Sequence, residues 1–399
     1  MPAQKIADVP PCDRVLEILT SKIVLVLGSF LSIVSAATLL HGKINRISFG
    51  CDFQWSACRI LLSRHDPWAI YLAGDPHHEF VLNQVPNYLH ELYVILCPFG
   101  LLRFSEARIV WAFINVGLVC LICFCIAHLY ELPKMKFWLL LVMVGTSASF
   151  RESIRNGQLN GLSIACIALW ALACTQRSRG LLLGFSYTKY SFPPVLVLFL
   201  LLRKRWRLLF YSAIPPLIGF LILDAWLKTP SIKLAVEPFK TAMHPGALTP
   251  SSGNIILLAG ETLKRVSPHS FWSIYFPQVL GLALGLLIAA YFRQESGETD
   301  GRILLACLMT ASLTCFPHLF YDYYLIVFCL AISLKARPSP TRNVSLAIIA
   351  YLWYVAPLLH TRIAQSLSLD VIVFCALLTL IALTNSMRNT TKWSSTWEI

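Results

Sequence analysis

The chain is poor in charged residues. Only 13% of its 399 residues are Asp, Glu, Lys or Arg, whereas 57% are hydrophobic. Soluble domains carry roughly 25% charged residues, so this composition argues against a large soluble domain. Acidic residues are fewer than basic residues, with 20 Asp and Glu against 33 Lys and Arg. We therefore expect residues 1–399 to form a single integral membrane domain that is entirely α-helical.

The sequence also lacks the motifs that usually bind nucleotides or activate water. It contains no GxGxxG, Walker, HExxH or GxSxG segment. It has no DxD that would hold a metal–nucleotide-sugar complex. Most of its 13 cysteines lie inside apolar runs, where they behave as small hydrophobes, and Cys120-x-x-Cys123 has no second ligand pair. We expect no metal site, no cofactor and no soluble nucleotide substrate.

Long apolar runs are abundant and recur along the whole chain. Their lengths approach the roughly 20 residues that a transmembrane helix needs, and they predict about 10–12 transmembrane helices. The expected spans are Ile23–Leu40, Leu89–Leu102, Ile109–Leu129, Phe137–Phe150, Leu159–Thr175, Leu181–Leu202, Leu208–Leu227, Phe271–Phe292, Ile303–Phe316, Leu319–Leu334, Val344–His360 and Val371–Met387. Three of them, the second, fourth and ninth, are short enough to be tilted or re-entrant.

The basic residues cluster in short loops between these runs. That distribution is typical of the positive-inside rule, and it accounts for the net charge of +13 without nucleic acid as a partner. It predicts that both termini lie in the cytoplasm. Residues 42–88, residues 228–270 and the turn Phe316–Asp322 would then lie on the outer side, the first two as long loops with helices of their own. Three polar regions converge on one membrane face, which suggests a site at the outer leaflet.

Asp52 is the first carboxylate after the first apolar run. It precedes Phe53 and Trp55 at the expected membrane boundary. Desolvation there would raise its pKa and suit it to act as a general base. An ordinary solvated loop aspartate is the alternative.

Downstream, Asp66-Pro-Trp68 resembles a helix start, and Trp68 and Tyr71 suit a helix lying on the membrane surface. Asp66 is a weaker candidate for a second acid.

Three further segments place polar groups inside apolar runs. Residues 156–161, Asn-Gly-Gln-Leu-Asn-Gly, would form either a tight helix contact or the lining of a polar cavity. Lys189 lies within an expected span, where an ammonium group must face protein or water. It would neutralise a phosphate or a buried acid. His318 and Asp322 are four residues apart and would share a helical face, either as site residues or as a pair that stabilises the helix start.

The order of these segments resembles glycosyltransferase family 87. The relevant stretches are Asp-Phe at 52–53, HDPWAIY at 65–71, PFGLL at 98–102, NGQLNG at 156–161, YTKYSFPPVLVLFLLLRKRW at 187–206, SSGN at 251–254 and FPHLFYDYY at 316–324. Together they cover roughly residues 45–330. GQLN, followed by a run with Lys and Pro and then a basic cluster, is the most specific part.

The resemblance implies a GT-C fold in the bacterial cytoplasmic membrane. Family members take a sugar, often mannose, from a polyprenyl-phosphate donor and invert the anomeric centre. The acceptor would be a glycolipid or glycan on the periplasmic or exterior side. Asp52 falls on the position of the general base. Lys189, His318 and Arg59 would hold the leaving phosphate, and the expected donor phosphate or sugar-binding set also includes Gln158, Asn160 and Asp322.

Two departures from the family pattern concern the donor. The chain has Tyr88-Leu-His-Glu91 where members often have Tyr-Pro-Pro, and Asp322-Tyr323 where mannosyltransferases of the family tend to carry His-His.

The alternative function is a multi-pass transporter or flippase of lipid-linked saccharides, with Lys189 and Asp322 as gating charges. Such proteins often contain internal repeats, and the two halves of this chain share no convincing similarity.

Overall fold

The structure is a computed structural model that describes residues 53–81, 84–242, 271–295, 300–316, 318, 320–356, 376 and 379. All regular elements in these ranges are helices, as the composition predicts. Asp52 and the expected spans Ile23–Leu40 and Val371–Met387 lie outside the described residues, apart from positions 376 and 379. The two expected outer loops are described in part, over residues 53–81, 84–88 and 228–242.

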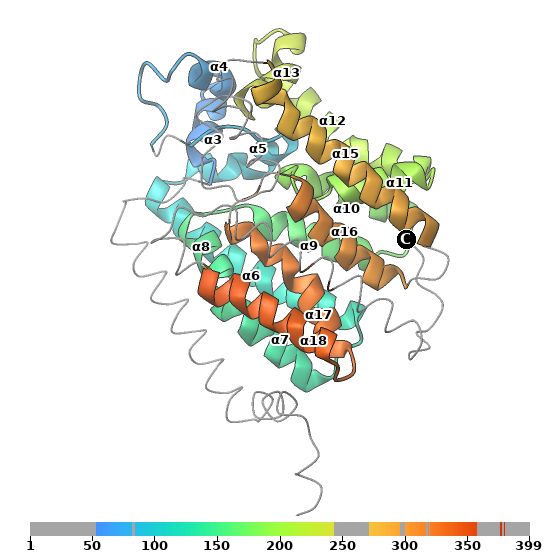
Figure 1. The fold of residues 1–399 in the computed structure, drawn as a ribbon. Coiled ribbons are helices and arrows are strands. Elements are labelled where there is room, and N and C mark those ends of the chain that lie inside the picture. Colours follow the sequence, from blue (N-terminus) through green and yellow to red (C-terminus); the bar gives the residue numbers. More distant parts are fainter. Residues whose placement is uncertain are drawn as a thin grey trace, which may run out of the picture.

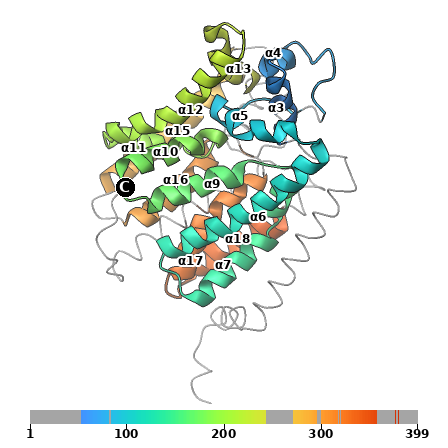
Figure 2. The ribbon, with the colours of Figure 1, turned by 180° about the vertical axis from the view of Figure 1, so that it is seen from behind.

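An upper helical cluster collects most of the first expected loop (Figure 1; Figure 2). It comprises α3 (Trp55–Leu62), α4 (Pro67–Leu72), α5 (His90–Leu96), the 3₁₀ helix η2 (Cys97–Leu101) and α13 (Ser231–Ala242). These helices share an apolar core of their own. Two contacts hold α13 in this cluster: Leu234 O lies 3.1 Å from His90 Nε2, and Thr241 Oγ1 donates to Pro86 O at 3.0 Å.

Below this cluster lies a larger bundle whose helices run from the upper cluster to the opposite end. Its first helix is α6 (Phe104–Leu129), followed by α7 (Lys134–Thr146), α8 (Ala148–Arg155) and α9 (Asn160–Leu172). Trp111 Nε1 donates to Gly157 O, and Gly161 packs against Asn115 of α6. Since residue numbers rise together along this contact, α6 and α9 run parallel, and their C-terminal ends lie at the same end of the bundle.

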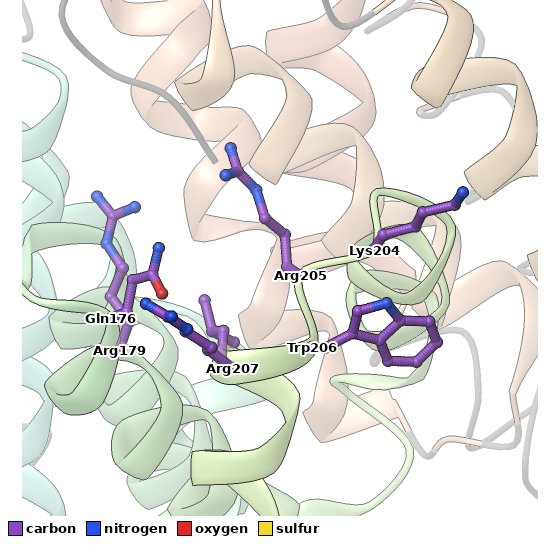
Figure 3. Close-up of a pocket in the computed structure, with 7 residues that line it drawn as sticks. Gln176, Arg179, Lys204, Arg205, Trp206 and Arg207 are labelled. Carbon is purple, nitrogen blue, oxygen red and sulfur yellow. The ribbon is translucent and has the colours of Figure 1, made fainter.

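The expected span Leu181–Leu202 is wrong as a single crossing. It consists of α10 (Gln176–Ser186), the 3₁₀ turn η3 (Tyr187–Lys189) and α11 (Pro194–Leu202). Arg179 before this segment and Arg205 after it line one pocket (Figure 3), so the chain leaves and returns at the same end. We call residues 176–202 the first hairpin. The sequence analysis assigned its two ends to opposite membrane faces, because an apolar run does not show where the chain reverses.

The expected spans Ile303–Phe316 and Leu319–Leu334 form a second hairpin, as two spans joined by a short turn would. They are α16 (Gly301–Cys315), the 3₁₀ helix η4 (Phe320–Ile326) and α17 (Val327–Lys335). Arg302 Nη1 and Lys335 Nζ both reach the carboxylate of Glu131, at 3.0 and 3.6 Å, so the two ends of this second hairpin meet. The turn that was expected on the outer surface is therefore enclosed, and Asp322 at its centre is only 1% exposed.

The same end of the bundle carries most of the described basic loops. It is formed by residues 130–136, 173–179, 203–207, 300–302 and 335–342, and we call it the basic end. Arg302 and Lys335 join two of these loops to Glu131, and the parallel pairing of α6 with α9 brings residues 173–179 to the same side.

Two expectations in the upper cluster are also wrong. The run Leu89–Leu102 forms α5 and η2, twelve residues that reach about 18 Å and are too short to cross a bilayer. Trp68 was expected to be a membrane-surface residue, yet it is fully buried and lies against the rings of Tyr93 and His90. Asp66 does start the helix as predicted, because its Oδ1 accepts the Ala69 N–H.

Two helices among the described residues have the length and composition to cross a membrane. They are α6, with 26 residues, and α12 (Trp206–Trp226), with 21. Both present large apolar side chains to the outside, including Phe113 and Phe124 on α6 and Phe210 and Leu217 on α12. The remaining helices are α15 (Phe271–Glu295), which lies against α11, and α18 (Pro340–Ala350) with the π-helical turn η5 (Tyr351–Val355).

Close packing of the first hairpin on α12 generates the first prediction. A Cβ at Gly184 would lie 2.4 Å from Ser212 O, so Gly184→Ala must separate α10 from α12. We expect it to lower the free energy of unfolding by about 1–3 kcal/mol, the usual cost of overpacking. The thermal unfolding midpoint of the purified protein would report the change.

Gly117→Ala on α6 is the matched control, because a Cβ there meets no atom within 4 Å. It should be neutral or stabilising by about 0.5–1 kcal/mol, since alanine favours helix over glycine. Equal midpoints for the two variants would contradict the close contact at Gly184.

Candidate functional site

The tip of the first hairpin carries Lys189. Helix α10 ends at Ser186, and Pro194 opens α11 at a position where its missing N–H costs nothing. The tip also bonds to the second hairpin, because Val195 N donates to Ser312 Oγ at 3.4 Å. The sequence between the two helices thus forces a turn deep in the bundle, and Lys189 is its only cation.

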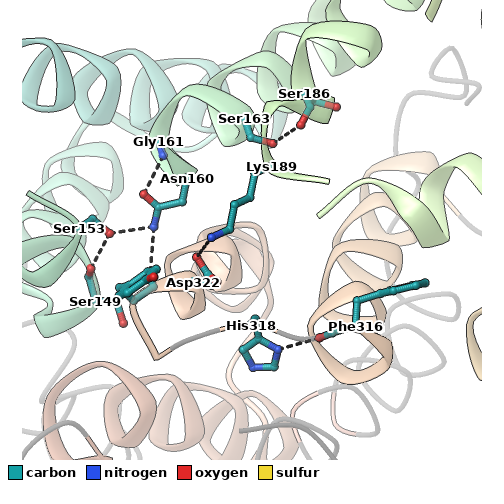
Figure 4. Close-up of polar contacts among 11 residues, drawn as sticks. Ser149, Ser153, Asn160, Gly161, Ser163, Ser186, Lys189, Phe316, His318 and Asp322 are labelled. Atoms are coloured by element: carbon teal, nitrogen blue, oxygen red, sulfur yellow. Dashed lines mark hydrogen bonds and ion pairs between the residues drawn. The ribbon is translucent and has the colours of Figure 1, made fainter. Parts of the chain in front are cut away.

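Lys189 pairs with Asp322 at the tip of the second hairpin. Lys189 Nζ lies 3.2 Å from Asp322 Oδ1, and their side chains are only 12% and 1% exposed (Figure 4). The ammonium also lies 5.4 Å from the ring centre of Tyr321 and 5.8 Å from that of Phe192. A charge in such surroundings is expensive unless it is paired. The predicted role of Lys189 as counter-ion to a buried acid is therefore present in this structure.

Asn160 joins the same centre from α9. Its Nδ2 donates to Ser153 Oγ at 2.8 Å and to Tyr321 O at 3.0 Å, while its Oδ1 accepts the Gly161 N–H (Figure 4). Of the two interpretations of residues 156–161, the close helix contact is confirmed by the packing of Gly161 on α6, and Asn160 bonds directly to the residue before Asp322. Gln158 is buried in the loop before α9, and its backbone N–H donates to Ser153 O.

His318 lies near the ion pair, although not through a shared helical face. It precedes η4 rather than belonging to a helix with Asp322, so the predicted four-residue spacing on one helix is wrong. Its Nδ1 lies 3.1 Å from Phe316 O, and its ring contacts that of Tyr323. Nε2 is buried without a hydrogen-bond partner among the described residues.

The residues that follow Asp52 are tightly fixed. Phe53 and Gln54 have φ of 45° and 69°, two successive residues in the left-handed region that side chains disfavour. Phe53 is buried and stacks on Trp111, with ring centres 5.6 Å apart. Trp111 Nε1 in turn donates to Gly157 O at 3.2 Å. Strain held in place by packing is common at functional sites. A continuous chain of contacts thus connects the residue after Asp52 to the loop that carries Asn160.

Arg59 does not belong to this centre. It lies exposed on α3, with its guanidinium carbon 5.5 Å from the ring centre of Trp55. Nothing in the sequence distinguished Arg59 from the cations that pair with acids. Within the described ranges, no group of three or more His, Cys, Asp and Glu side chains could hold a metal ion.

A second acid cluster lies in the upper helical cluster, and its buried member Glu237 escaped the sequence analysis. Asp66 accepts a 2.8 Å hydrogen bond from Thr229 Oγ1, and Glu237 of α13 lies beside it with a buried side chain. Burial, together with the neighbouring Asp66, raises the pKa of Glu237 to about 7, while Lys233 at 3.5 Å opposes the shift. The i, i+4 pair Lys233–Glu237 was visible in the sequence, but its partner Asp66 lies far away along the chain.

Glu91 is the other buried acid that was missed. Its side chain is buried on α5, and neither carboxylate oxygen has a hydrogen-bond partner among the described residues. Its backbone lies against α12, where a Cβ at Gly219 would be 2.3 Å from Glu91 N. In the sequence, Glu91 is an acidic residue inside an apolar run, and that position was the signal that could have marked it as a candidate.

A family model described as glycosyltransferase family 87 matches residues 92–317, more than half of the chain. The matched range includes Lys189 and Asn160 and stops just before His318 and Asp322. No curated protein matches the chain.

The buried ion pair generates a prediction about stability. Lys189→Gln and Asp322→Asn, made singly, each leave one buried charge without its partner and should cost about 3–5 kcal/mol. The double variant removes both charges and should recover most of that loss. Thermal unfolding of the three variants measures the coupling.

Lys335→Gln provides the control, because its ion pair with Glu131 is partly exposed. It should cost about 1 kcal/mol or less. A double variant as unstable as the sum of the single variants would show that Lys189 and Asp322 do not stabilise each other.

The acid cluster generates a pH prediction. The folded state raises the pKa of Glu237 above its ordinary value of 4.5 to about 7, so the folded chain keeps a proton that the unfolded chain releases. Stability should therefore fall as pH rises between these two values, by on the order of 1–3 kcal/mol. Glu237→Gln should flatten this dependence.

Thermal unfolding midpoints at pH 5 and pH 8, together with hydrogen exchange over α13, test this prediction. Glu152→Gln, which alters a surface pair with Arg155, is the matched control and should keep the parental slope. An unchanged slope in Glu237→Gln would exclude Glu237 as the titrating group.

Proposed function

Because the chain belongs to glycosyltransferase family 87, we propose that it transfers a hexose, such as mannose, from a polyprenyl-phosphate donor to a glycolipid or glycan acceptor. Family membership establishes the glycosyltransferase class. The observation that supports the finer proposal is the Lys189–Asp322 pair, which lies where two hairpins meet, near a buried His318 Nε2 that has no hydrogen-bond partner among the described residues. A departing lipid phosphate needs cationic and hydrogen-bonding partners of this kind.

In the proposed reaction, the acceptor hydroxyl attacks the anomeric carbon as its proton passes to Asp52. The bond from that carbon to the phosphate oxygen breaks, and the anomeric configuration inverts. The leaving phosphate would take Lys189 from Asp322 and a hydrogen bond from His318. The strained backbone at Phe53 and Gln54, directly after Asp52 in the sequence, supports a functional role for this segment, because such strain is common at functional sites.

The proposed setting is the bacterial cytoplasmic membrane, with the upper helical cluster outside and both termini inside. The outward apolar side chains of α6 and α12 support contact with lipid tails. The concentration of Lys and Arg at the basic end supports a cytoplasmic position for that end. Two hairpins that reverse inside the bundle are compatible with a membrane, since their turns are buried in protein.

An assay of purified protein with polyprenyl-phosphate sugars and a panel of acceptors tests the proposal. Asp52→Asn should reduce transfer by about 10²–10⁴-fold, the usual contribution of a general base, without altering the unfolding midpoint. The stable double variant Lys189→Gln with Asp322→Asn should also be inactive, because it folds without the phosphate-binding cation.

Asp224→Asn removes another acid near the upper end of α12 and should retain full transfer. Full activity of Asp52→Asn would eliminate this residue as the base. Buried charges and broken helices also occur in transporters. Movement of the lipid-linked sugar across vesicles, with no transfer to any acceptor, would favour the alternative function as a transporter or flippase.

A further inference from the structure

Glu91 lies where α5, α12 and the tip of the first hairpin meet. The residue is 2% exposed, and neither carboxylate oxygen has a hydrogen-bond partner among the described residues. No Lys or Arg in the described ranges forms an ion pair with it. Buried polar groups are nearly always bonded, so an isolated carboxyl at a junction of three elements needs an explanation. The proposed reaction does not use this residue.

One face of α12 contacts both α10 and α5. Ser212, Pro215 and Gly219 are spaced by three and four residues, which places them on this face, and all three are buried. The first two meet α10, because a Cβ at Gly184 would lie 2.4 Å from Ser212 O and 2.7 Å from Pro215 Cδ. The third meets α5, because a Cβ at Gly219 would lie 2.3 Å from Glu91 N and 2.9 Å from Glu91 Cβ. The end of α10 and the start of α5 therefore follow each other along α12.

Tyr187 approaches this junction from the first hairpin. It is the first residue of η3, the turn whose last residue is Lys189. Its Oη donates to Ser212 Oγ at 2.8 Å, and its side chain lies within electrostatic reach of Glu91. The hydrogen bond to Ser212 thus fixes the start of the turn that brings Lys189 to Asp322. A carboxylate accepts a stronger hydrogen bond than a serine hydroxyl and would compete for the Tyr187 proton.

The charge of Glu91 is sensitive to pH near neutrality. Burial raises the pKa of Glu91 to about 7, and the interaction with its own backbone N–H opposes this shift only in part. Neither Asp224 of α12 nor Arg59 of α3 contributes to the shift. The neighbouring His90 is directed away, with Nε2 at 3.1 Å from Leu234 O on α13. Glu91 is therefore mostly neutral at pH 6 and mostly ionised at pH 8.

We propose that Glu91 is a positioning residue that controls the tip of the first hairpin through Tyr187. When Glu91 is neutral, Tyr187 stays bonded to Ser212, and η3 holds Lys189 beside Asp322. When Glu91 releases its proton to solvent, the carboxylate competes with Ser212 for the Tyr187 hydroxyl and displaces η3. The consequence for sugar transfer rests on the proposed function, in which Lys189 holds the departing phosphate.

Sugar transfer measured from pH 6 to pH 8 tests this proposal. Glu91→Gln keeps the shape of the side chain but cannot ionise. The ratio of the parental transfer rate to that of Glu91→Gln should fall by about tenfold over this range, because a group with a pKa of about 7 is only about one-tenth protonated at pH 8. Taking the ratio cancels the titration of the other groups in the reaction centre.

Tyr187→Phe tests the same link without altering α5. It has no hydroxyl for which Glu91 can compete, so its pH profile should have the shape of the Glu91→Gln profile, and the double variant should add nothing further. Asp224→Asn removes an acid of α12 that does not act on Glu91 and should keep the parental profile. A constant ratio of parent to Glu91→Gln, or a parental pH dependence in Tyr187→Phe, would overturn the proposal.

Hydrogen exchange over residues 187–192 gives a readout that needs no substrate. At pH 8 these amides should exchange faster in the parent than in Glu91→Gln, and at pH 6 the two proteins should agree, because local opening follows the ionisation of Glu91. Comparison at equal pH removes the intrinsic pH dependence of exchange. Failure of the parent to transfer sugar at any pH would count against the proposed function, whereas the exchange difference would still support the role of Glu91. Equal exchange at pH 8 would overturn that role.

Discussion

The ion pair between Lys189 and Asp322 is the contact on which the inner architecture depends. Each residue occupies the tip of a hairpin that starts and ends at the basic end, and neither hairpin could bury its charge alone. An unpaired charge in a low-dielectric interior is costly, so the pair holds the two hairpin tips together inside the bundle.

Small residues make these reversals possible. Gly180 and Gly184 allow α10 to approach the backbone of α12, and the paired prolines after Lys189 start α11. Serine hydroxyls donate hydrogen bonds to backbone carbonyls near the tips that the broken helices leave unpaired. Ser163 Oγ, for example, donates to Ser186 O at 2.6 Å. In an apolar environment such groups must be satisfied within the protein. The polar residues of the interior are thus required by the broken helices as well as by chemistry.

The upper helical cluster connects to this interior through aromatic contacts. Phe53 stacks on Trp111, which bonds to the loop before α9, so the segment after Asp52 and the segment with Asn160 have a common support. The same cluster contains the Asp66–Glu237 pair, which joins α4 to α13. Titration of that pair affects how firmly α13 is held, while the interior charges stay enclosed.

The sequence by itself determined the helical class and the family, and it singled out Lys189, Asn160, His318 and Asp322 as candidates, because apolar run length and rare polar residues inside those runs are local properties. It also gave the helix start at Asp66. Only the tertiary structure decided that Leu181–Leu202 reverses as a hairpin, that the turn before Asp322 is enclosed, that Trp68 is core and that Arg59 stands apart. Hydropathy measures whether a segment is buried and carries no information on its direction. Reversal at Lys189 and the pairing of Asp66 with Glu237 depend on partners more than a hundred residues away along the chain.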